Sequence, residues 1–595
     1  MKVNIMAFDS LKPEMTVSNR RLSVIAWTTA AMLLGFLCLT HLGVLVCFLT
    51  SQAALPFVVP VAFAGALIIG DRLGQREGLC GRTRLWPLGL TFGLTVLAVG
   101  VSAAFYDLSW DGQWYHQVGI YRMVEGWNPL KTPMQAFTGH NQLWVRHYAK
   151  GPWYVGSALM ALTGHVEWGK FVTWLAVDAA FLAVLAACLD AGTRRWRAMA
   201  VAAVVALNPV VTSEILSFLV DGLMVSFLAC YAAALFSGFR RPSRLVVFVG
   251  MAAVICSINS KFTGLVFLCF ICAGAGLYSL FKRRDLFWRF VGLNLAAMVL
   301  GTVAFGYNPY ITNIIHRGHP FYPLMGTKAH PSLSQQGDDP IEKYETPHNM
   351  MGRNRLVRFG YALFGRPGAQ PFNDGPNARL MWPFLVPPRD LALYRYHETR
   401  IAGFGPFFSG ALLISLVLAG WLLFRPGMPR GLILLSYATL AFSLLVSIHT
   451  WWARYGPQMW WFPILPLVAV FWGSRSRVQT GVAWALVVIL MVNALIVATV
   501  RVNWEVTSTR TLHRQLVELR DSGKGLEIDF QWFGEPVGER LKTWGIPYHA
   551  VRMGQIQDGP ELMSVVAGYP GGIHYRLKEG AQPAVQIRTD GQNRP

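Results

Sequence analysis

Long apolar runs separated by short polar links are the feature that most constrains how this chain can fold. A helix needs about 20 apolar residues to cross the hydrocarbon core of a bilayer. Runs of that length, or nearly so, lie at residues 22–48, 53–70, 86–106, 171–191, 198–213, 222–239, 245–260, 263–280, 286–306, 408–424, 431–449, 460–473 and 480–500. We therefore expect an all-α polytopic membrane protein with about 13 transmembrane helices, several of them tilted or locally broken.

The basic residues occupy the links between these runs. A net charge of +21 would also suit a nucleic-acid partner, but Lys and Arg fall largely in short clusters, as the positive-inside rule distributes them. We therefore expect no nucleic-acid partner. The clusters share one side of the membrane if the N-terminus is cytoplasmic, and an odd number of spans then places the C-terminus on the other side. They lie at residues 72–84, 194–197, 240–244, 282–284, 425–430 and 475–477.

Three polar regions fall together on the opposite, external side. Residues 107–170 are rich in Trp, Tyr and His, as expected of helices that lie in the membrane interface. Residues 307–407 contain many Pro and Gly turns and predict a long structured loop. Residues 501–595 alternate helical and β-type runs and predict a small α/β cap domain. The expected division is a transmembrane domain over residues 1–500, with these two external loops, followed by the cap.

Acidic, basic and aromatic residues gather at the predicted external boundary. An acid at the mouth of a membrane span is costly unless it faces a polar cavity, so it is a candidate functional group. Asp107 and Asp111 lie four residues apart directly after the run 86–106. The other candidates, from the same stretch and four others, are Tyr115, His116, Lys150, Glu214, Asp221, Lys261, Trp452, Arg454 and Tyr455.

This combination suits transfer from a lipid-linked phosphate to an acceptor hydroxyl. A carboxylate can take the hydroxyl proton, and a cation can stabilise the charge that grows on the leaving phosphate. Arg454 with Lys150 or Lys261 would form a phosphate clamp. Nearby tryptophans would hold a sugar face or a prenyl chain, or form an ordinary interfacial aromatic belt. They are Trp451, Trp452, Trp460 and Trp461.

The stretch WDGQWYHQVGIYRMVEGWNPL resembles the first external loop of GT-C-fold, lipid-phosphate-dependent glycosyltransferases, the class of protein mannosyltransferases and aminoarabinose transferases. In many bacterial members an acid precedes a Tyr-His pair by four residues, as Asp111 precedes Tyr115. HYAKGPWYVGSALMALTG is similar to the family's Lys-Pro-Pro-Leu segment, with Lys150 at the lysine and Gly-Pro in place of the double proline. NPVVTSEILSFLVDGLMVSF resembles a later segment that ends in an acid, here Asp221, and NSKFTG resembles a third, with Lys261.

The resemblance covers roughly residues 86–275, and it departs from the class in having two spans before the motif-bearing one. It implies an inverting glycosyltransferase in the bacterial cytoplasmic (inner) membrane that takes a sugar from a polyprenyl-phosphate donor at the periplasmic face. The acceptor would be a glycan, a lipid or a protein. The N-terminus would be cytoplasmic and the C-terminus periplasmic.

The resemblance also assigns roles to the candidate residues. Asp111 would be the general base, with Asp107 as the second choice. Donor phosphate would be bound by Arg454, Lys150 and Lys261, and substrate would be contacted by Tyr115, His116, Glu214, Asp221, Trp452 and Tyr455. Some relatives use a divalent cation such as Mg²⁺ or Mn²⁺. This chain has no Asp-x-Asp and no His/Cys ligand spacing, so no metal ligand is assigned.

Two other functions fit parts of the same pattern. An O-antigen polymerase or ligase-like enzyme would use external arginines and a lipid-pyrophosphate donor, for which Arg353, Arg355, Arg358 and Arg454 are candidates. A lipid or sugar transporter would need an ionisable group deep in the bilayer, and Asp178 is the acid predicted there.

Overall fold

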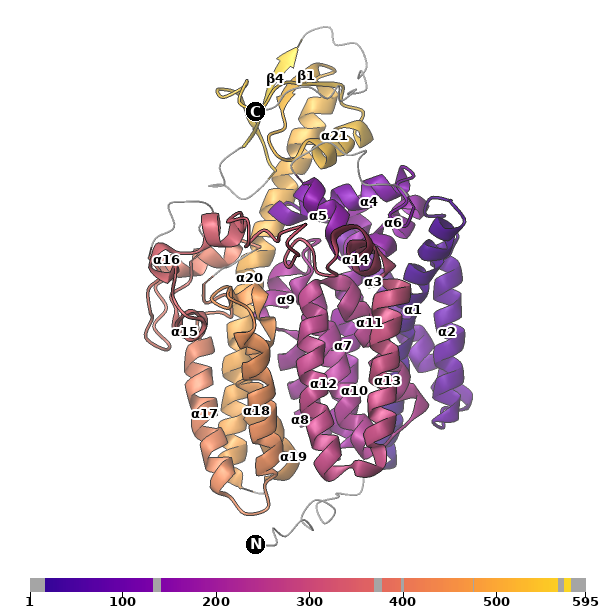
Figure 1. Ribbon diagram of the computed structural model, residues 1–595, viewed down its shortest axis with the longest axis vertical. Helices are drawn as coiled ribbons and strands as arrows, with labels where there is room; N and C mark the ends of the chain where they lie inside the picture. The colour runs from indigo at the N-terminus through magenta and orange to yellow at the C-terminus, as the bar shows by residue number, and fades with distance from the viewer. Residues whose placement is uncertain are drawn as a thin grey trace.

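The computed structural model describes residues 16–131, 141–368, 377–397, 401–474, 476–564 and 572–578. Helices run side by side as one thick layer, and a small α/β unit stands on one end of it (Figure 1). We call that end of the layer the capped end and the opposite end the basic end. Among the described residues, eight helices are long and apolar enough to cross a membrane. The protein is therefore membrane-embedded and mostly α-helical.

These eight helices correspond to eight of the thirteen predicted runs. They are α1 (Val17–Leu49), α2 (Val58–Arg76), α3 (Leu85–Ala103), α7 (Phe171–Asp190), α10 (Asp221–Arg240), α12 (Phe262–Lys282), α13 (Phe287–Val299) and α20 (Arg477–Asp521). Short helical turns lengthen three of them, so that the spanning segments are Gly81–Ala103, Val166–Asp190 and Arg284–Phe305.

The prediction of about 13 full spans is wrong. The other five runs form helices of 10 to 17 residues, shorter than the eight spans. They are α8 (Arg195–Ala206), α11 (Arg244–Ser260), α17 (Phe408–Phe424), α18 (Arg430–Leu445) and α19 (Ile464–Gly473). The run 198–213, for example, breaks at Asn208, whose side chain accepts a hydrogen bond from the Val210 N–H and starts a separate helix, α9 (Pro209–Glu214).

Short helices lie across the capped end of the layer (Figure 1). After α3 the chain forms a π-turn, Gly112–His116, and then three helices, α4 (Gln117–Val124), α5 (Gln142–His147) and α6 (Gly151–Thr163). The second external loop carries α14 (Thr312–Arg317), α15 (Arg355–Phe364) and α16 (Pro388–Leu391). At 13 residues, α6 is too short to span a bilayer.

Two apolar cores hold the helical layer together. One is built mainly on α1, α6, α7, α10 and α11, with Trp153 and Tyr154 of α6 fully buried in it. The other joins α8 to α17, α18, α19 and α20. In Figure 1 they form the right and left parts of the layer. The turns that carry the predicted basic clusters, such as α10 to α11 and α12 to α13, lie at the basic end.

The C-terminal unit has a four-stranded sheet of order β2-β1-β4-β3. Its elements are β1 (Gly525–Asp529), α21 (Gly534–Thr543), β2 (Tyr548–Ala550), β3 (Glu561–Leu562) and β4 (Ile573–Lys578). Strand β1 pairs in parallel with β2, as a β-α-β crossover requires, and antiparallel with β4. Helix α20 runs unbroken from the layer into this unit, so the expected division at residue 501 falls inside one helix.

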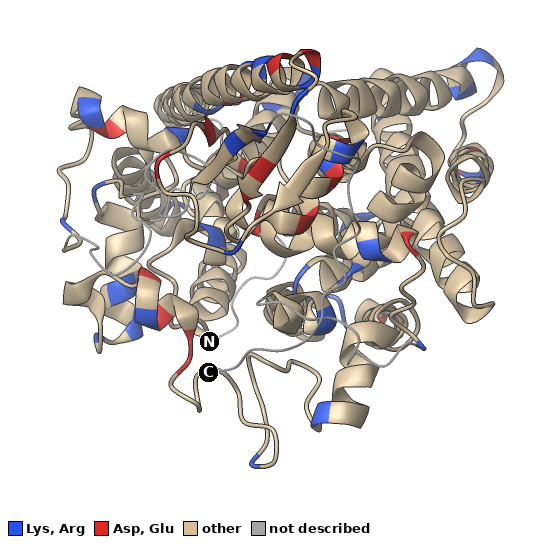
Figure 2. Ribbon diagram, turned by 90° about the horizontal axis from the view of Figure 1, so that it is seen from above, with Lys and Arg blue, Asp and Glu red and all other residues tan. Residues whose placement is uncertain are grey.

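The C-terminal unit is fastened to the first external loop. Leu108 is buried in the core of the unit, with Trp110 and Trp114 packed against it. An ion pair of 3.0 Å joins Arg122 of α4 to Glu535 of α21. Viewed onto the capped end, acidic and basic residues alternate along the ribbon of the unit (Figure 2).

We predict that the folded protein loses stability as pH rises through the range in which Glu535 loses its proton. Burial raises the pKa of Glu535 from 4.5 to about 7, against the opposing effect of Arg122. The folded state therefore binds more protons than the unfolded state between pH 4.5 and 7, and stability falls as pH rises through that window. Glu535→Gln should remove this dependence and raise the Tm at pH 8 by about 2 °C or more.

The measurement is thermal unfolding of the purified protein between pH 5 and pH 8. Glu518→Gln, at an exposed position of α20, is the matched control and should keep the wild-type pH dependence. An unchanged pH dependence in Glu535→Gln would contradict the role given to this carboxyl group.

Candidate functional site

The first external loop is held in shape by Asp107. Its two carboxylate oxygens accept hydrogen bonds from the backbone N–H groups of Ser109, at 2.8 Å, and Phe218, at 2.9 Å. Gly112 packs directly on this carboxylate, so close that no Cβ would fit there. The side chain of Asp107 is fully buried, and burial raises its pKa, with Lys170 opposing the shift. Asp107 thus ties the loop to the segment before α10.

Four charged side chains meet at the capped end, and we call them the ion cluster. Arg454 Nη2 lies 2.8 Å from Asp111 Oδ2, and its Nε lies 3.9 Å from Asp221 Oδ2. Lys261 Nζ forms an ion pair with Asp221 Oδ1. The structure therefore brings together four residues that the sequence places in four separate stretches.

Local backbone structure explains how each member reaches the ion cluster. Asp221 is the first residue of α10, where the helix dipole favours an acid. Lys261 is the single extended residue between α11 and α12. Arg454 belongs to a one-turn helix, Ala453–Tyr455, that follows α18.

Asp111 is the most accessible member of the ion cluster. Its side chain is 15% exposed, compared with 9% for Arg454 and 3% for Asp221. Burial raises the pKa of Asp111, but the charge of Arg454, its hydrogen bond to Asp111 and the charge of Lys261 outweigh burial and hold the pKa below its ordinary value. Asp111 is therefore ionised at neutral pH and can accept a proton.

Glu214 is a second acid beside the ion cluster, in the opposite protonation state. Burial, reinforced by the charge of Asp221, raises its pKa well above the ordinary value. Its Oε2 accepts a 2.6 Å hydrogen bond from the Gly222 N–H. Its Oε1 is buried and has no hydrogen-bond partner among the described residues. At neutral pH Glu214 is therefore protonated, whereas Asp111 is ionised.

Tyr115 and His116 form an aromatic wall next to Asp111. Their ring centroids are 4.3 Å apart, and Tyr115 also contacts the ring of Tyr148 at 5.5 Å. The indole N–H of Trp153 donates a 2.7 Å hydrogen bond to His116 Nδ1. Burial lowers the pKa of His116 to about 3, so the ring is neutral and its proton is on Nε2. Within the described part of the chain this Nε2 has no partner.

Lys150 does not join the ion cluster. Its ammonium group donates to the carbonyl oxygens of Arg146, at 2.9 Å, and Tyr148, at 2.8 Å. It lies over the rings of Trp127 and Trp153, at 5.8 and 5.4 Å from their centroids. The side chain is fully buried, and burial lowers its pKa well below the ordinary value. These contacts place Lys150 behind the aromatic wall.

Trp452 and Tyr455 flank the cations. The guanidinium of Arg454 lies 4.6 Å from the ring centroid of Trp452, and Lys261 Nζ lies 4.5 Å from that of Tyr455. Trp451 stacks on Trp452 at 5.5 Å. Trp460, in contrast, donates to the Val204 carbonyl in the core of the second helix group. The predicted frame of four tryptophans is therefore divided between the site and the helix core.

A buried ion pair behind the site was not among the sequence-based candidates. Arg501 and Glu505 of α20 pair with each other, and Arg501 donates to the carbonyl of Ser213, next to Glu214, at 3.0 Å. Glu505 also lies 2.8 Å from His397 Nε2. Two opposite charges four residues apart, directly after the apolar run 480–500, are the sequence signal that could have identified this pair.

An apolar cavity of about 330 Å³ opens between α10 and α12 on one side and α18 and α19 on the other. Ala229, which lines it, follows Asp221 by eight residues on α10, or about 12 Å along the helix. Trp461, which closely follows Arg454 in sequence, lines it as well. The lining continues to Arg240 and Trp472, so the cavity lies within the layer, between the level of Ala229 and the basic end.

No three His, Cys, Asp or Glu side chains are grouped as a metal site in the parts of the chain that the structure describes. The two acids of the ion cluster are already bound by side-chain cations, Asp111 by Arg454 and Asp221 by Lys261. A divalent cation would have to displace those side chains, so the present arrangement does not fit one.

Comparison with known proteins gives no match to a family model and no match to a curated sequence. Function therefore has to be derived from the site itself.

We predict that the ion cluster is a unit of stability as well as a site. Asp221→Ala would leave Lys261 buried without its carboxylate and bring unbalanced positive charge next to Arg454. The expected cost is about 3 kcal/mol or more in the free energy of unfolding. Glu539→Ala, which breaks the exposed pair with Lys542, should cost less than about 1 kcal/mol. Denaturant unfolding of both variants provides the measurement. Equal losses of unfolding free energy in the two variants would contradict a stabilising role of the ion cluster.

Proposed function

We propose that the protein is a GT-C-type glycosyltransferase that moves a sugar from a polyprenyl-phosphate donor to an acceptor hydroxyl with inversion at the sugar carbon. The acceptor would be a glycan, a lipid or a protein. The observation that carries the proposal is the contact between an ionised Asp111 and Arg454, in a protein whose apolar cavity begins about 12 Å along α10 from Asp221. A base, a phosphate-binding cation and space for a lipid chain then share one site.

In the proposed reaction the acceptor oxygen attacks the anomeric carbon as its proton passes to Asp111. The bond between that carbon and the phosphate oxygen breaks, and the phosphate leaves with the electron pair. Arg454, with its planar array of donors, would stabilise the charge that grows on the phosphate. Lys261 pairs with the other carboxylate oxygen of Asp221 and adds positive charge to the ion cluster.

The neutral groups around the ion cluster would bind the sugar and the acceptor. Tyr115 and Trp452 offer ring faces of the kind on which sugars stack. His116 Nε2–H, buried and without a partner among the described residues, can donate a hydrogen bond to a sugar hydroxyl. Protonated Glu214 can do the same through its free oxygen, next to Asp221.

The polyprenyl chain of the donor would lie in the apolar cavity between α10, α12, α18 and α19. We expect a donor with one phosphate, because the two cations of the ion cluster are each already paired with a carboxylate, Arg454 with Asp111 and Lys261 with Asp221. Of the arginines considered for a pyrophosphate donor, Arg358 binds both carboxylate oxygens of Glu342, and Arg355 donates to the Leu445 carbonyl.

The positive-inside rule suggests an orientation for this reaction. The basic end would face the cytoplasm of a bacterial cell, and the capped end, with the ion cluster and the C-terminal unit, would face the periplasm. The N-terminus would then be cytoplasmic and the C-terminus periplasmic. The donor would be used in the outer leaflet of the cytoplasmic membrane.

Asp111→Asn is expected to abolish sugar transfer, with a loss of at least about 100-fold in kcat, because the amide cannot take the acceptor proton. Binding of the donor should survive, because the contact of Arg454 with phosphate is retained. The measurement is transfer from a radiolabelled polyprenyl-phosphate sugar by protein in proteoliposomes. The matched control is Asp558→Asn, which changes an exposed acid of the C-terminal unit and should leave transfer unchanged. Full activity of Asp111→Asn would rule out this carboxylate as the base.

The donor class is tested by comparing polyprenyl monophosphate with polyprenyl pyrophosphate as competitive inhibitors of transfer. Polyprenyl monophosphate should bind at least about tenfold more tightly than the pyrophosphate. Arg454→Lys should weaken the binding of the monophosphate about tenfold, because lysine cannot make a bidentate contact. Tighter binding of the pyrophosphate would favour a polymerase or ligase reaction. Movement of the lipid across liposomes without any covalent product would favour transport.

A further inference from the structure

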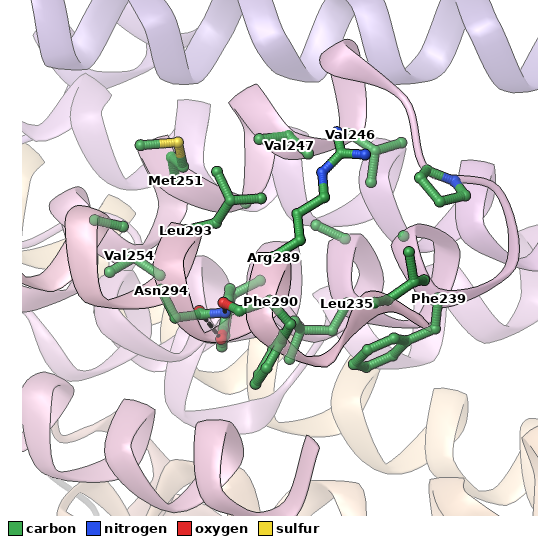
Figure 3. Close-up of a pocket in the computed structure, with 17 residues that line it drawn as sticks. Leu235, Phe239, Val246, Val247, Met251, Val254, Arg289, Phe290, Leu293 and Asn294 are labelled. Atoms are coloured by element: carbon green, nitrogen blue, oxygen red, sulfur yellow. Dashed lines mark hydrogen bonds between the residues drawn. The ribbon is translucent and has the colours of Figure 1, made fainter. Parts of the chain in front are cut away.

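A second cavity lies among α10, α11 and α13, toward the basic end of the layer (Figure 3). It has a volume of about 100 Å³. Side chains of Leu235, Phe239, Val247, Met251 and Leu293 give it an apolar lining. The ion cluster and the aromatic wall contribute no residue to this lining, although Leu235 and Phe239 of α10 also line the first cavity.

One cation stands in this otherwise apolar lining. Arg289 of α13 lines the cavity, and its guanidinium lies toward Val246 and Val247 in Figure 3. It is exposed, and among the described residues it has no ion pair and no hydrogen-bond partner. The acid one turn earlier, Asp285, is occupied, because both of its oxygens accept hydrogen bonds from Arg283.

The other polar groups of the cavity are satisfied by the protein. Tyr231 OH donates to Asn294 Oδ1, and Asn294 Nδ2 donates to the Phe290 carbonyl at 2.8 Å. Arg289 is therefore the group in this lining that is left to bind an anion.

The surroundings place Arg289 at the level of lipid headgroups. Trp288, beside it on α13, is 78% exposed, and Phe281 is 67% exposed, as expected of side chains that anchor a protein at a membrane interface. Arg244, Lys282 and Arg284 add exposed positive charge from the two neighbouring turns. An anion with an attached hydrocarbon chain matches both parts of the site, because the charge meets the arginine and the chain meets the apolar lining.

We propose that this cavity binds one anionic phospholipid from the adjacent leaflet, with the headgroup phosphate on Arg289 and one acyl chain between α10, α11 and α13. Free phosphate would satisfy the arginine but leave the apolar lining empty. Bound lipid would fill the space between α13 and the α10–α11 hairpin, and would stabilise the folded protein in proportion to its occupancy.

The first test measures lipid binding to the full chain in detergent by native mass spectrometry, with phosphatidylglycerol and phosphatidylcholine of the same acyl chains. Phosphatidylglycerol should bind at least about fivefold more tightly. Arg289→Gln should raise its Kd about tenfold, as expected from the loss of one charge-assisted hydrogen bond. Lys282→Gln removes one positive charge from the same end of the layer without lining the cavity, and it should change the Kd less than about twofold.

The second test fills the cavity. A Cβ on Gly238 would meet Val246 at an ordinary contact distance of 3.8 Å, so Gly238→Leu can place its side chain in the space proposed for the acyl chain. This variant should lose most of the increase in Tm that phosphatidylglycerol gives the wild type. Equal affinity of the wild type for the two lipids, or unchanged phosphatidylglycerol binding by Arg289→Gln and Gly238→Leu, would overturn the proposal. Neither readout depends on glycosyl transfer.

Discussion

The charge balance among Asp111, Asp221, Lys261 and Arg454 is the constraint on which the capped end depends. Each group is largely withdrawn from water, so each needs a partner of opposite sign, and no two of them are close in sequence. These ion pairs bring together the first external loop, the start of α10, the link between α11 and α12 and the turn after α18. The two helix groups of the layer are joined at this point, because Arg454 comes from one and both acids come from the other.

Other features of the capped end support this contact. Asp107 holds the loop that carries Asp111, and the C-terminal unit buries Leu108 on the other face of the same loop. Arg501 and Glu505 extend the polar network from α20 to the segment that ends in Glu214. Asp111 is thus fixed from several directions while its own side chain stays accessible. This is the arrangement expected where a charged group must remain available to a ligand in a low-dielectric setting.

Much of this architecture was predictable because hydropathy depends on local sequence. All thirteen apolar runs are helical, and the C-terminal unit has the expected mixture of helix and strand. The number of full spans was not predictable in the same way, since it depends on helix length and on breaks inside a run, such as the one at Asn208. The pairing of Asp111 with Arg454 joins residues 343 positions apart, and no local pattern specifies such a contact. Lys150 was grouped with the phosphate ligands by motif, whereas its environment is set by carbonyls and rings that only the fold brings together.

The central claim is that Asp111 and Arg454 form the reacting end of a lipid-phosphate site. The most direct measurement is an experimental structure of the protein bound to a polyprenyl monophosphate. The account predicts phosphate density within hydrogen-bonding distance of Arg454 and next to Asp111, with the chain continuing between α10 and α18. Phosphate density elsewhere on the protein, with the contact between Asp111 and Arg454 undisturbed, would contradict it.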